Sequence, residues 1–172
     1  MIIIRPETPD DYAAIYEVNQ LAFDGSDAEP QLVEAIRQSA EFIPELSLVA
    51  EEDGRVVGHI LFSPITLATE AGSIPALALA PMAVLPEYQK HGIGTTLVRY
   101  GLEKCKRLNH HIIVVLGHPS FYPRFGFSAD LARPLACPFG DCGEAWMALE
   151  LVPGTLDGVI GKAVFPKAFE NV

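Results

Sequence analysis

Residues 74–108 read IPALALAPMAVLPEYQKHGIGTTLVRYGLEKCKRL and predict a strand, a glycine turn and an amphipathic helix in succession. The strand is predicted from Ile74 to Val84, with a bulge or splay near Pro81, because proline cannot donate to a sheet ladder. The helix is predicted from Gly94 to Leu108, since apolar side chains recur on one face opposite charged ones. That apolar stripe consists of Leu97, Val98, Leu102, Cys105 and Leu108.

The N-terminal half predicts a strand, two helices and a hairpin. Met1 to Ile4 is a short β-branched strand, and Thr8-Pro9-Asp10-Asp11 opens a helix, because threonine caps, proline fits the first turn and acids suit the helix dipole. We expect this helix to bury Ile15, Val18, Leu21 and Ala22. A second helix is predicted from Glu29 or Pro30 to Ser39, with Leu32, Ala35 and Ile36 inward. Strands at Leu46–Ala50 and Val56–Leu67 flank Asp53-Gly54, a dipeptide typical of a type I′ hairpin turn.

The C-terminal half predicts fewer regular elements. Ile112 to Leu116 reads as a buried strand, Ser120 caps a short helix through Arg124, and Trp146 to Val152 forms a last strand. Residues Asp130 to Gly143 are a Pro/Gly-rich excursion. The order β, α, α, β, β, β, α, β, α, β predicts a mixed α/β sandwich, one domain over residues 1–172, with early antiparallel hairpins and a right-handed parallel β-α-β crossover.

Composition narrows the classes of function. With 172 residues, 49% hydrophobic and 20% charged, the chain is long and apolar enough for a real core. A net charge of −10 opposes nucleic acid as a partner. The absence of a long apolar run or secretory leader predicts no membrane partner and a cytoplasmic protein. Cys105, Cys137 and Cys142 are expected to be reduced structural thiols, with no metal site.

The segment Gln89-Lys90-His91-Gly92-Ile93-Gly94 is the candidate binding turn. At a helix start several backbone N–H groups have no partner inside the helix, and glycine lets phosphate oxygens approach closely. Lys90 or His91 adds positive charge at the rim. The turn lacks the Gly-Lys-Ser/Thr of a P-loop and the third glycine of a dinucleotide fingerprint. An ordinary strand-to-helix loop is the alternative interpretation.

The run from Met82 to Leu97 resembles the acetyl-CoA signature of the GNAT acetyltransferases, Gln/Arg-x-x-Gly-x-Gly/Ala, which Gln89, Gly92 and Gly94 match. The resemblance implies a GNAT-like, mostly antiparallel mixed sheet with helices on both faces around the central parallel crossover. It also implies acetyl-CoA as co-substrate, bound at the pyrophosphate by Gln89, Lys90, His91, Gly92, Ile93, Gly94 and Thr95. The strand end formed by Met82, Ala83 and Val84 would pair with the pantetheine arm, and the Val84 N–H would polarise the thioester carbonyl.

The resemblance covers nearly the whole chain, including Phe121-Tyr122-x-x-Phe125-Gly126-Phe127 and the ending Gly161–Phe165. It is strongest to a subgroup of compact, mostly uncharacterised N-acetyltransferases. By this likeness Tyr122 contacts the cofactor and is the general acid that protonates the departing thiolate. Packing within the aromatic cluster is the alternative role for that tyrosine.

The general base and the acceptor stay open at this stage. No carboxylate lies within the Ile74–Val84 strand, which leaves Glu87, His59, His118 or a chain of waters. We therefore predict an N-acetyltransferase that moves acetyl directly to a primary amine, with Glu87 as candidate base. The alternatives are a non-catalytic acyl-CoA-binding or sensing module, and an interaction protein whose glycine turn is only a loop. A homodimer is compatible with the sequence, which does not specify the oligomeric state.

Overall fold

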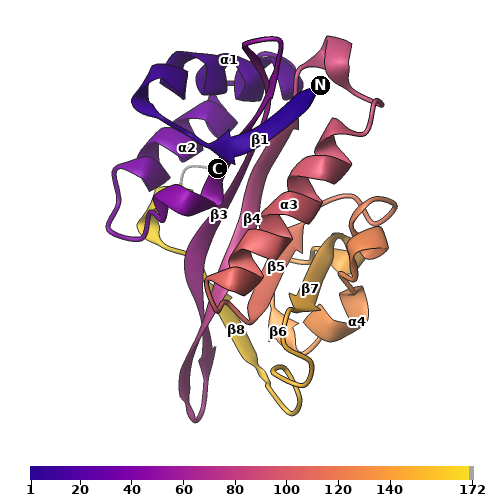
Figure 1. The fold of residues 1–172 in the computed structure, drawn as a ribbon. Coiled ribbons are helices and arrows are strands. Elements are labelled where there is room, and N and C mark those ends of the chain that lie inside the picture. Colours follow the sequence, from indigo (N-terminus) through magenta and orange to yellow (C-terminus); the bar gives the residue numbers. More distant parts are fainter. Residues whose placement is uncertain (171–172) are drawn as a thin grey trace. The chain divides into compact units, whose positions relative to one another are not determined.

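The computed structural model describes residues 1–170. Its strands are β1 (Ile2–Pro6), β2 (Ser47–Glu52), β3 (Arg55–Thr69), β4 (Gly72–Val84), β5 (Ile112–Leu116), β6 (Leu135–Ala136), β7 (Trp146–Glu150) and β8 (Gly161–Val164). Its α-helices are α1 (Tyr12–Ala22), α2 (Ala28–Arg37), α3 (Ile93–Arg107) and α4 (Ala129–Ala132), drawn in Figure 1. None of these helices is long and apolar enough to span a bilayer.

Hydrogen bonding orders the strands β1-β2-β3-β4-β5-β7, with β8 paired to both β3 and β6. The sheet is mostly antiparallel, and β4 pairs in parallel with β5, the strand that follows α3, so the predicted mixed fold with a parallel β-α-β unit is confirmed. The chain divides into two compact units. Unit 1 comprises Met1–Ser63, Ala80–Lys104 and the residues from Ala168, and unit 2 comprises Pro64–Leu79 and Cys105–Lys167. The single domain stays a prediction.

The hairpin that opens unit 1 is confirmed. Asp53 and Gly54 have φ angles of 50° and 81°, the positive values that a type I′ turn requires at both central residues. The turn joins β2 to β3 in antiparallel register, with Val49 opposite His59, and the register shifts between Ala50 and Glu51.

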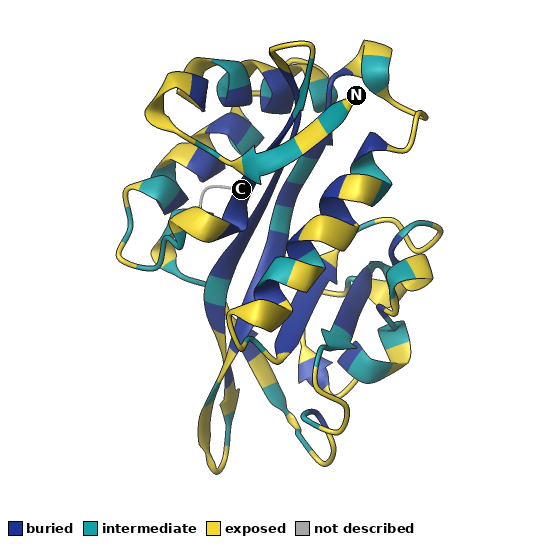
Figure 2. Ribbon diagram, viewed as in Figure 1, coloured by how far each residue is buried: buried dark blue, intermediate teal, exposed yellow. Residues whose placement is uncertain are grey.

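Helices cover both faces of the sheet within unit 1. Side chains alternate between the two faces of a sheet along a strand, so the neighbouring residues Gly58 and His59 of β3 face opposite sides of the sheet. His59 is hydrogen-bonded to Asn19 of α1, whereas a Cβ on Gly58 would meet Leu97 of α3. Figure 2 shows that this stretch of β3 is buried. The predicted helix cover is therefore present in this unit.

The first two helices begin and bury residues slightly differently from the sequence prediction. A 3-10 turn, Pro9–Asp11, precedes α1, and the Asp11 carboxylate accepts the Thr8 N–H at 2.7 Å. Leu21 is 43% exposed, so its predicted burial is wrong. The inward face carries Ile15, Val18 and the polar Asn19, a residue that hydrophobic spacing alone would not select.

The predicted stripe of α3 is largely confirmed, since Leu97, Val98 and Cys105 are fully buried. Leu108 lies beyond the end of the helix and is partly exposed, contrary to prediction. Gly101 also faces inward, because a Cβ there would collide with the ring of Phe62. A glycine on the packed face is invisible to a search for apolar side chains.

Unit 2 contains more structure than the sequence predicted. The expected excursion at 130–143 contains most of α4 and all of β6, and the unpredicted strand β8 pairs with the end of β3 through Leu67 opposite Ala163. The short helix expected after Ser120 is a 3-10 turn, Tyr122–Phe125. Strand β7 ends at Glu150, two residues before the predicted end.

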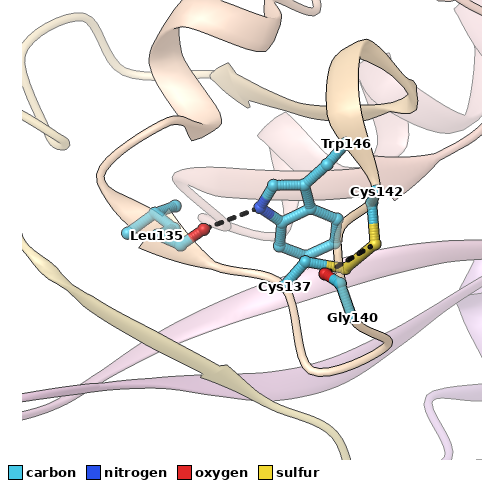
Figure 3. Close-up of a disulfide and its surroundings, with 5 residues drawn as sticks. All are labelled: Leu135, Cys137, Gly140, Cys142 and Trp146. Atoms are coloured by element: carbon cyan, nitrogen blue, oxygen red, sulfur yellow. Dashed lines mark hydrogen bonds between the residues drawn. A yellow bond between two sulfur atoms is a disulfide. The ribbon is translucent and has the colours of Figure 1, made fainter.

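Two of the three cysteines are paired, so the expectation of reduced thiols is wrong for them. Cys137 and Cys142 form a disulfide in the loop between β6 and β7, shown in Figure 3 with the hydrogen bond from the Trp146 indole N–H to the Leu135 carbonyl, 2.8 Å. The sequence separation of five closes a short loop that turns at Gly140, with φ of 100°. Cys105 is free and buried, as expected.

Candidate active site

The predicted binding turn connects β4 to α3 inside unit 1. After Val84 the chain makes a 3-10 turn, Pro86–Tyr88, and then passes through Lys90 and Gly92 with φ angles of 65° and 85°. These left-handed residues reverse the chain so that α3 can begin at Ile93. The Leu85 N–H donates to the Val57 carbonyl at 2.9 Å and anchors the turn to β3.

The start of α3 presents unpaired donors beside open space. Thr96 is the first residue whose N–H bonds within the helix, to the Gly92 carbonyl at 3.0 Å. The N–H groups of Ile93, Gly94 and Thr95 have no acceptor within residues 1–170. A Cβ on Gly92 would meet nothing within 4 Å. Donors with no internal partner, the positive end of a helix dipole and this open space together suit an anion.

Gln89 contacts its own turn. Its side-chain Nε2 donates to the Val84 carbonyl at 2.9 Å, which closes the loop between the end of β4 and the start of α3. Val84 is itself buried, and Met82 and Ala83 precede it in the strand. Lys90 and His91 are exposed at the tip of the turn. The signature glutamine therefore shapes the loop, while the two basic side chains remain available at its rim.

The carboxylate of Glu87 lies on the outside of this turn. Its side chain is 62% exposed, and its Oε1 is 3.7 Å from a guanidinium nitrogen of Arg55. The Arg55 guanidinium also lies 5.8 Å from the centre of the Tyr88 ring. Exposed pairs of this kind contribute little to stability, so Glu87 is free to rearrange.

Tyr122 belongs to an aromatic cluster in unit 2. Its ring meets Phe121 and Phe127 edge to face, with centroids 5.0 and 5.6 Å apart. The residue is 6% exposed, and burial raises the pKa of its phenol to about 12. The hydroxyl has no hydrogen-bond partner within residues 1–170, yet it is not among the fully buried unpaired side-chain atoms there. A packed ring thus carries a hydroxyl that still reaches solvent.

His59 is built into the core of unit 1. Its Nδ1 lies 3.1 Å from Asn19 Nδ2, a donor, and its Nε2 lies 3.0 Å from Ser47 Oγ. The Ser47 hydroxyl donates to Glu7, whose carboxylate also accepts two hydrogen bonds from Arg37. Burial, followed by the nearby charge of Arg37, lowers the pKa of His59 to about 3. A neutral ring with both nitrogens engaged and no exposed surface is a structural group.

Each unit also holds a cavity whose lining includes carboxylates. In unit 1 a cavity of about 310 Å³ is lined by Asp10, Glu17 and Arg55, among others. In unit 2 a cavity of about 380 Å³ is bordered by the disulfide loop, with Asp141 and Glu144 in its lining. Sequence reasoning did not select these carboxylates, because nothing in their spacing marks them as neighbours.

Comparison with known proteins identifies the family. Residues 3–129 match the family model for the acetyltransferase (GNAT) domain. The chain is 39% identical over 156 residues to the uncharacterized N-acetyltransferase YjhQ of Escherichia coli K12. The matched region covers 87% of this chain and 86% of YjhQ.

Two solved structures share the fold over almost the whole chain. The GNAT family N-acetyltransferase YhbS from Escherichia coli, crystallised in complex with CoA, has a TM-score of 0.88 at 31% identity, covering 98% of this chain and 91% of YhbS. A GNAT family acetyltransferase from Brucella melitensis, in complex with acetyl-CoA, has a TM-score of 0.80 at 33% identity, covering 99% of both chains. With this agreement in sequence and fold, and with an open glycine turn where the signature predicts one, the chain belongs to the GNAT acetyltransferase family.

Proposed function

We propose that the protein transfers an acetyl group from acetyl-CoA directly to a primary amine, within a ternary complex of enzyme and both substrates. The observation that carries the proposal is the turn at Gly92, where unpaired helix donors face open space. The bound CoA of YhbS and the bound acetyl-CoA of the Brucella protein support acetyl-CoA as co-substrate.

The residues of unit 1 fit the phosphate end of this co-substrate. The backbone N–H groups of Ile93, Gly94 and Thr95 would bind the pyrophosphate, with Lys90 and His91 adding charge at the rim. Each hydrogen bond to a charged group contributes about 1.5–3 kcal/mol, so three or four such bonds account for a micromolar affinity. Gln89 acts indirectly, by holding the turn through the Val84 carbonyl.

The pantetheine arm and the thioester would use the end of β4. An extended amide-bearing arm can bind a strand as an added strand would. Met82, Ala83 and Val84 provide that backbone, and the Val84 N–H would polarise the thioester carbonyl as negative charge develops on its oxygen.

Tyr122 would protonate the departing sulphur. A pKa of about 12 keeps the phenol protonated at neutral pH, so the donor is always present. Because thiols have pKa values near 8.5, the tyrosinate left behind is a stronger base than the thiolate and rapidly regains a proton. The protons of the reaction balance, because the amine loses one proton as its N–C bond forms and the sulphur gains one as its C–S bond breaks.

Glu87 remains our candidate base. Its exposure allows it to accept the proton of an ammonium substrate directly or through water. His118 is exposed and is the second candidate, whereas His59 is committed to the core. Replacing Glu87 by glutamine should lower turnover most at low pH, where the substrate is fully protonated.

An acceptor screen tests the proposal. Purified protein is incubated with acetyl-CoA and a panel of amines, beginning with cationic ones because the chain is acidic, and free CoA thiol is followed with a chromogenic disulfide. We expect Tyr122→Phe to lower kcat by about 100-fold with acetyl-CoA affinity unchanged. Tyr100→Phe, on the exposed face of α3, is the matched control and should keep full turnover.

Two outcomes would contradict the proposal. Turnover of an accepted amine by Tyr122→Phe at the wild-type rate removes the acid role. Calorimetric binding of acetyl-CoA without thiol release from any amine in a broad panel would favour the non-catalytic binding module instead.

A further inference from the structure

The five-residue segment from Gly117 to Phe121 links the end of β5 to Tyr122. Gly117 follows Leu116, the last residue of β5, and its N–H donates to the Ala145 carbonyl at 2.9 Å. The N–H of Tyr122 in turn donates to the His118 carbonyl at 3.3 Å. Both ends of the segment are therefore held by backbone hydrogen bonds within unit 2.

Gly117 is a glycine for a reason other than its backbone conformation. The glycines of residues 1–170 that have a positive φ, such as Gly92 and Gly126, do not include Gly117. Any L-residue could adopt its backbone angles. What excludes a side chain is the Tyr122 ring, because a Cβ on Gly117 would lie 2.9 Å from Cδ2 and closer still to Cε2.

The hydroxyl of Tyr122 is aimed by ring packing alone. No hydrogen bond from residues 1–170 holds its oxygen. The ring instead packs against Phe121 and Phe127 in edge-to-face geometry, and it occupies the space that a Cβ on Gly117 would need. Because no hydrogen bond orients the Tyr122 hydroxyl, its position is set by the atoms that pack against the ring.

We propose that Gly117 is a positioning residue for the reaction: its missing side chain lets the Tyr122 ring seat deeply enough to place the hydroxyl at the thioester sulphur. The inference rests on the acid role assigned to Tyr122 under the proposed function. A methyl group at this site must push the Cδ2 atom from 2.9 Å to at least 3.4 Å to restore ordinary contact, because Gly117 is tied to Ala145 and cannot retreat freely.

The test is a double-mutant cycle with Gly117→Ala and Tyr122→Phe. A displacement of about 1 Å at a reacting group can cost about 100-fold in rate, so we expect Gly117→Ala to lower kcat by about 10- to 100-fold with KM for acetyl-CoA within about twofold. Phenylalanine keeps the ring and removes the hydroxyl. In the Tyr122→Phe background, Gly117→Ala should therefore lower kcat no further.

A matched control separates positioning from packing damage. Gly101 meets a ring in the same way, because a Cβ there would lie 2.8 Å from Cζ of Phe62 and closer to Cε1. Gly101→Ala should lower the melting temperature as Gly117→Ala does, while kcat stays within about twofold of wild type. An equal loss of kcat in both variants would overturn the proposal, and so would an undiminished effect of Gly117→Ala when the hydroxyl is absent.

Ionisation of Tyr122 is a readout that does not depend on turnover. Tyrosinate absorbance, taken as the difference between each protein and its Tyr122→Phe partner, should show the Tyr122 pKa falling from about 12 toward 10 in Gly117→Ala. An unshifted titration would overturn the claim that Gly117 seats the ring. If Tyr122→Phe keeps full activity but the titration shifts as expected, the acid role fails while the seating of the ring stands.

A suppressor covers the case in which Gly117→Ala does not fold. Tyr122→Leu removes the ring, so Gly117→Ala should be tolerated in that background and the double variant should be soluble with a cooperative melt. If the double variant still fails to fold, the ring is not what excludes a side chain at residue 117.

Discussion

Replacing Gly92 tests the candidate binding turn, Gln89–Gly94, most directly. Gly92 has a φ of 85°, and a Cβ there would meet no atom within 4 Å in the free protein. In free protein, alanine therefore adds only backbone strain, about 1–2 kcal/mol for an L-residue in the left-handed region. Under the proposed function, the same Cβ would take the space of a phosphate oxygen when acetyl-CoA binds.

The expected loss of acetyl-CoA affinity in Gly92→Ala follows from the hydrogen bonds that the turn would make to phosphate. Displacing one phosphate oxygen from one N–H of α3 removes a charge-assisted hydrogen bond of about 1.5–3 kcal/mol. At about 1.4 kcal/mol per tenfold, Gly92→Ala should weaken acetyl-CoA binding by about 10- to 150-fold. Valine adds two methyl groups and should abolish binding.

Gly25 provides the control, because its φ is 83° and its Cβ would also meet nothing within 4 Å. Calorimetry with acetyl-CoA gives the affinity, and urea denaturation gives the free energy of unfolding. Gly25→Ala and Gly92→Ala should lose similar stability, but only the latter should lose affinity. Wild-type affinity in Gly92→Val would refute the assignment of this turn.

Two further predictions concern stability. His59 has a pKa of about 3 in the folded protein and near 6.5 in the unfolded chain, so between these pH values the unfolded chain binds one more proton. The free energy of unfolding should therefore fall as the pH drops below 6.5, by at most about 1.4 kcal/mol per pH unit. Urea denaturation from pH 7 to about 4.5 checks this, and an equal slope in His59→Gln would contradict it. Reducing the Cys137–Cys142 disulfide should lower the free energy of unfolding by about 2 kcal/mol, because the loop that it closes is short. Alkylation of the native protein should label no thiol before reduction and two thiols after it, since Cys105 is buried and its pKa is raised to about 12. Labelling of Cys105 in native protein, or stability unchanged by reduction, would show that these accounts are wrong.

The elements that the sequence predicted well are those with local causes. Asp53-Gly54 supplies the left-handed conformations of its turn, and the 3.6-residue period of Leu97, Val98 and Cys105 identifies the buried face of α3 without any knowledge of what lies opposite. The glycine turn could be placed at the start of α3 for the same reason, since strand, turn and helix are consecutive.

The elements that were missed depend on partners far away in the chain. Strand β8 is short and weakly apolar, and it forms because Ala163 can pair opposite Leu67. Leu21 is exposed because the inward face of α1 is turned by Asn19, which bonds to a histidine forty residues later. The disulfide was missed because a spacing of five residues says nothing about whether two sulphur atoms meet.

The order of strands and helices, the hairpin turn and the glycine-rich helix start follow from neighbouring residues, because backbone angles and side-chain periodicity are local properties. The tertiary structure decides the protonation of His59 and the seating of the Tyr122 ring on Gly117. Desolvation and steric contact depend on which distant atoms surround a group, and only the folded chain brings those atoms together.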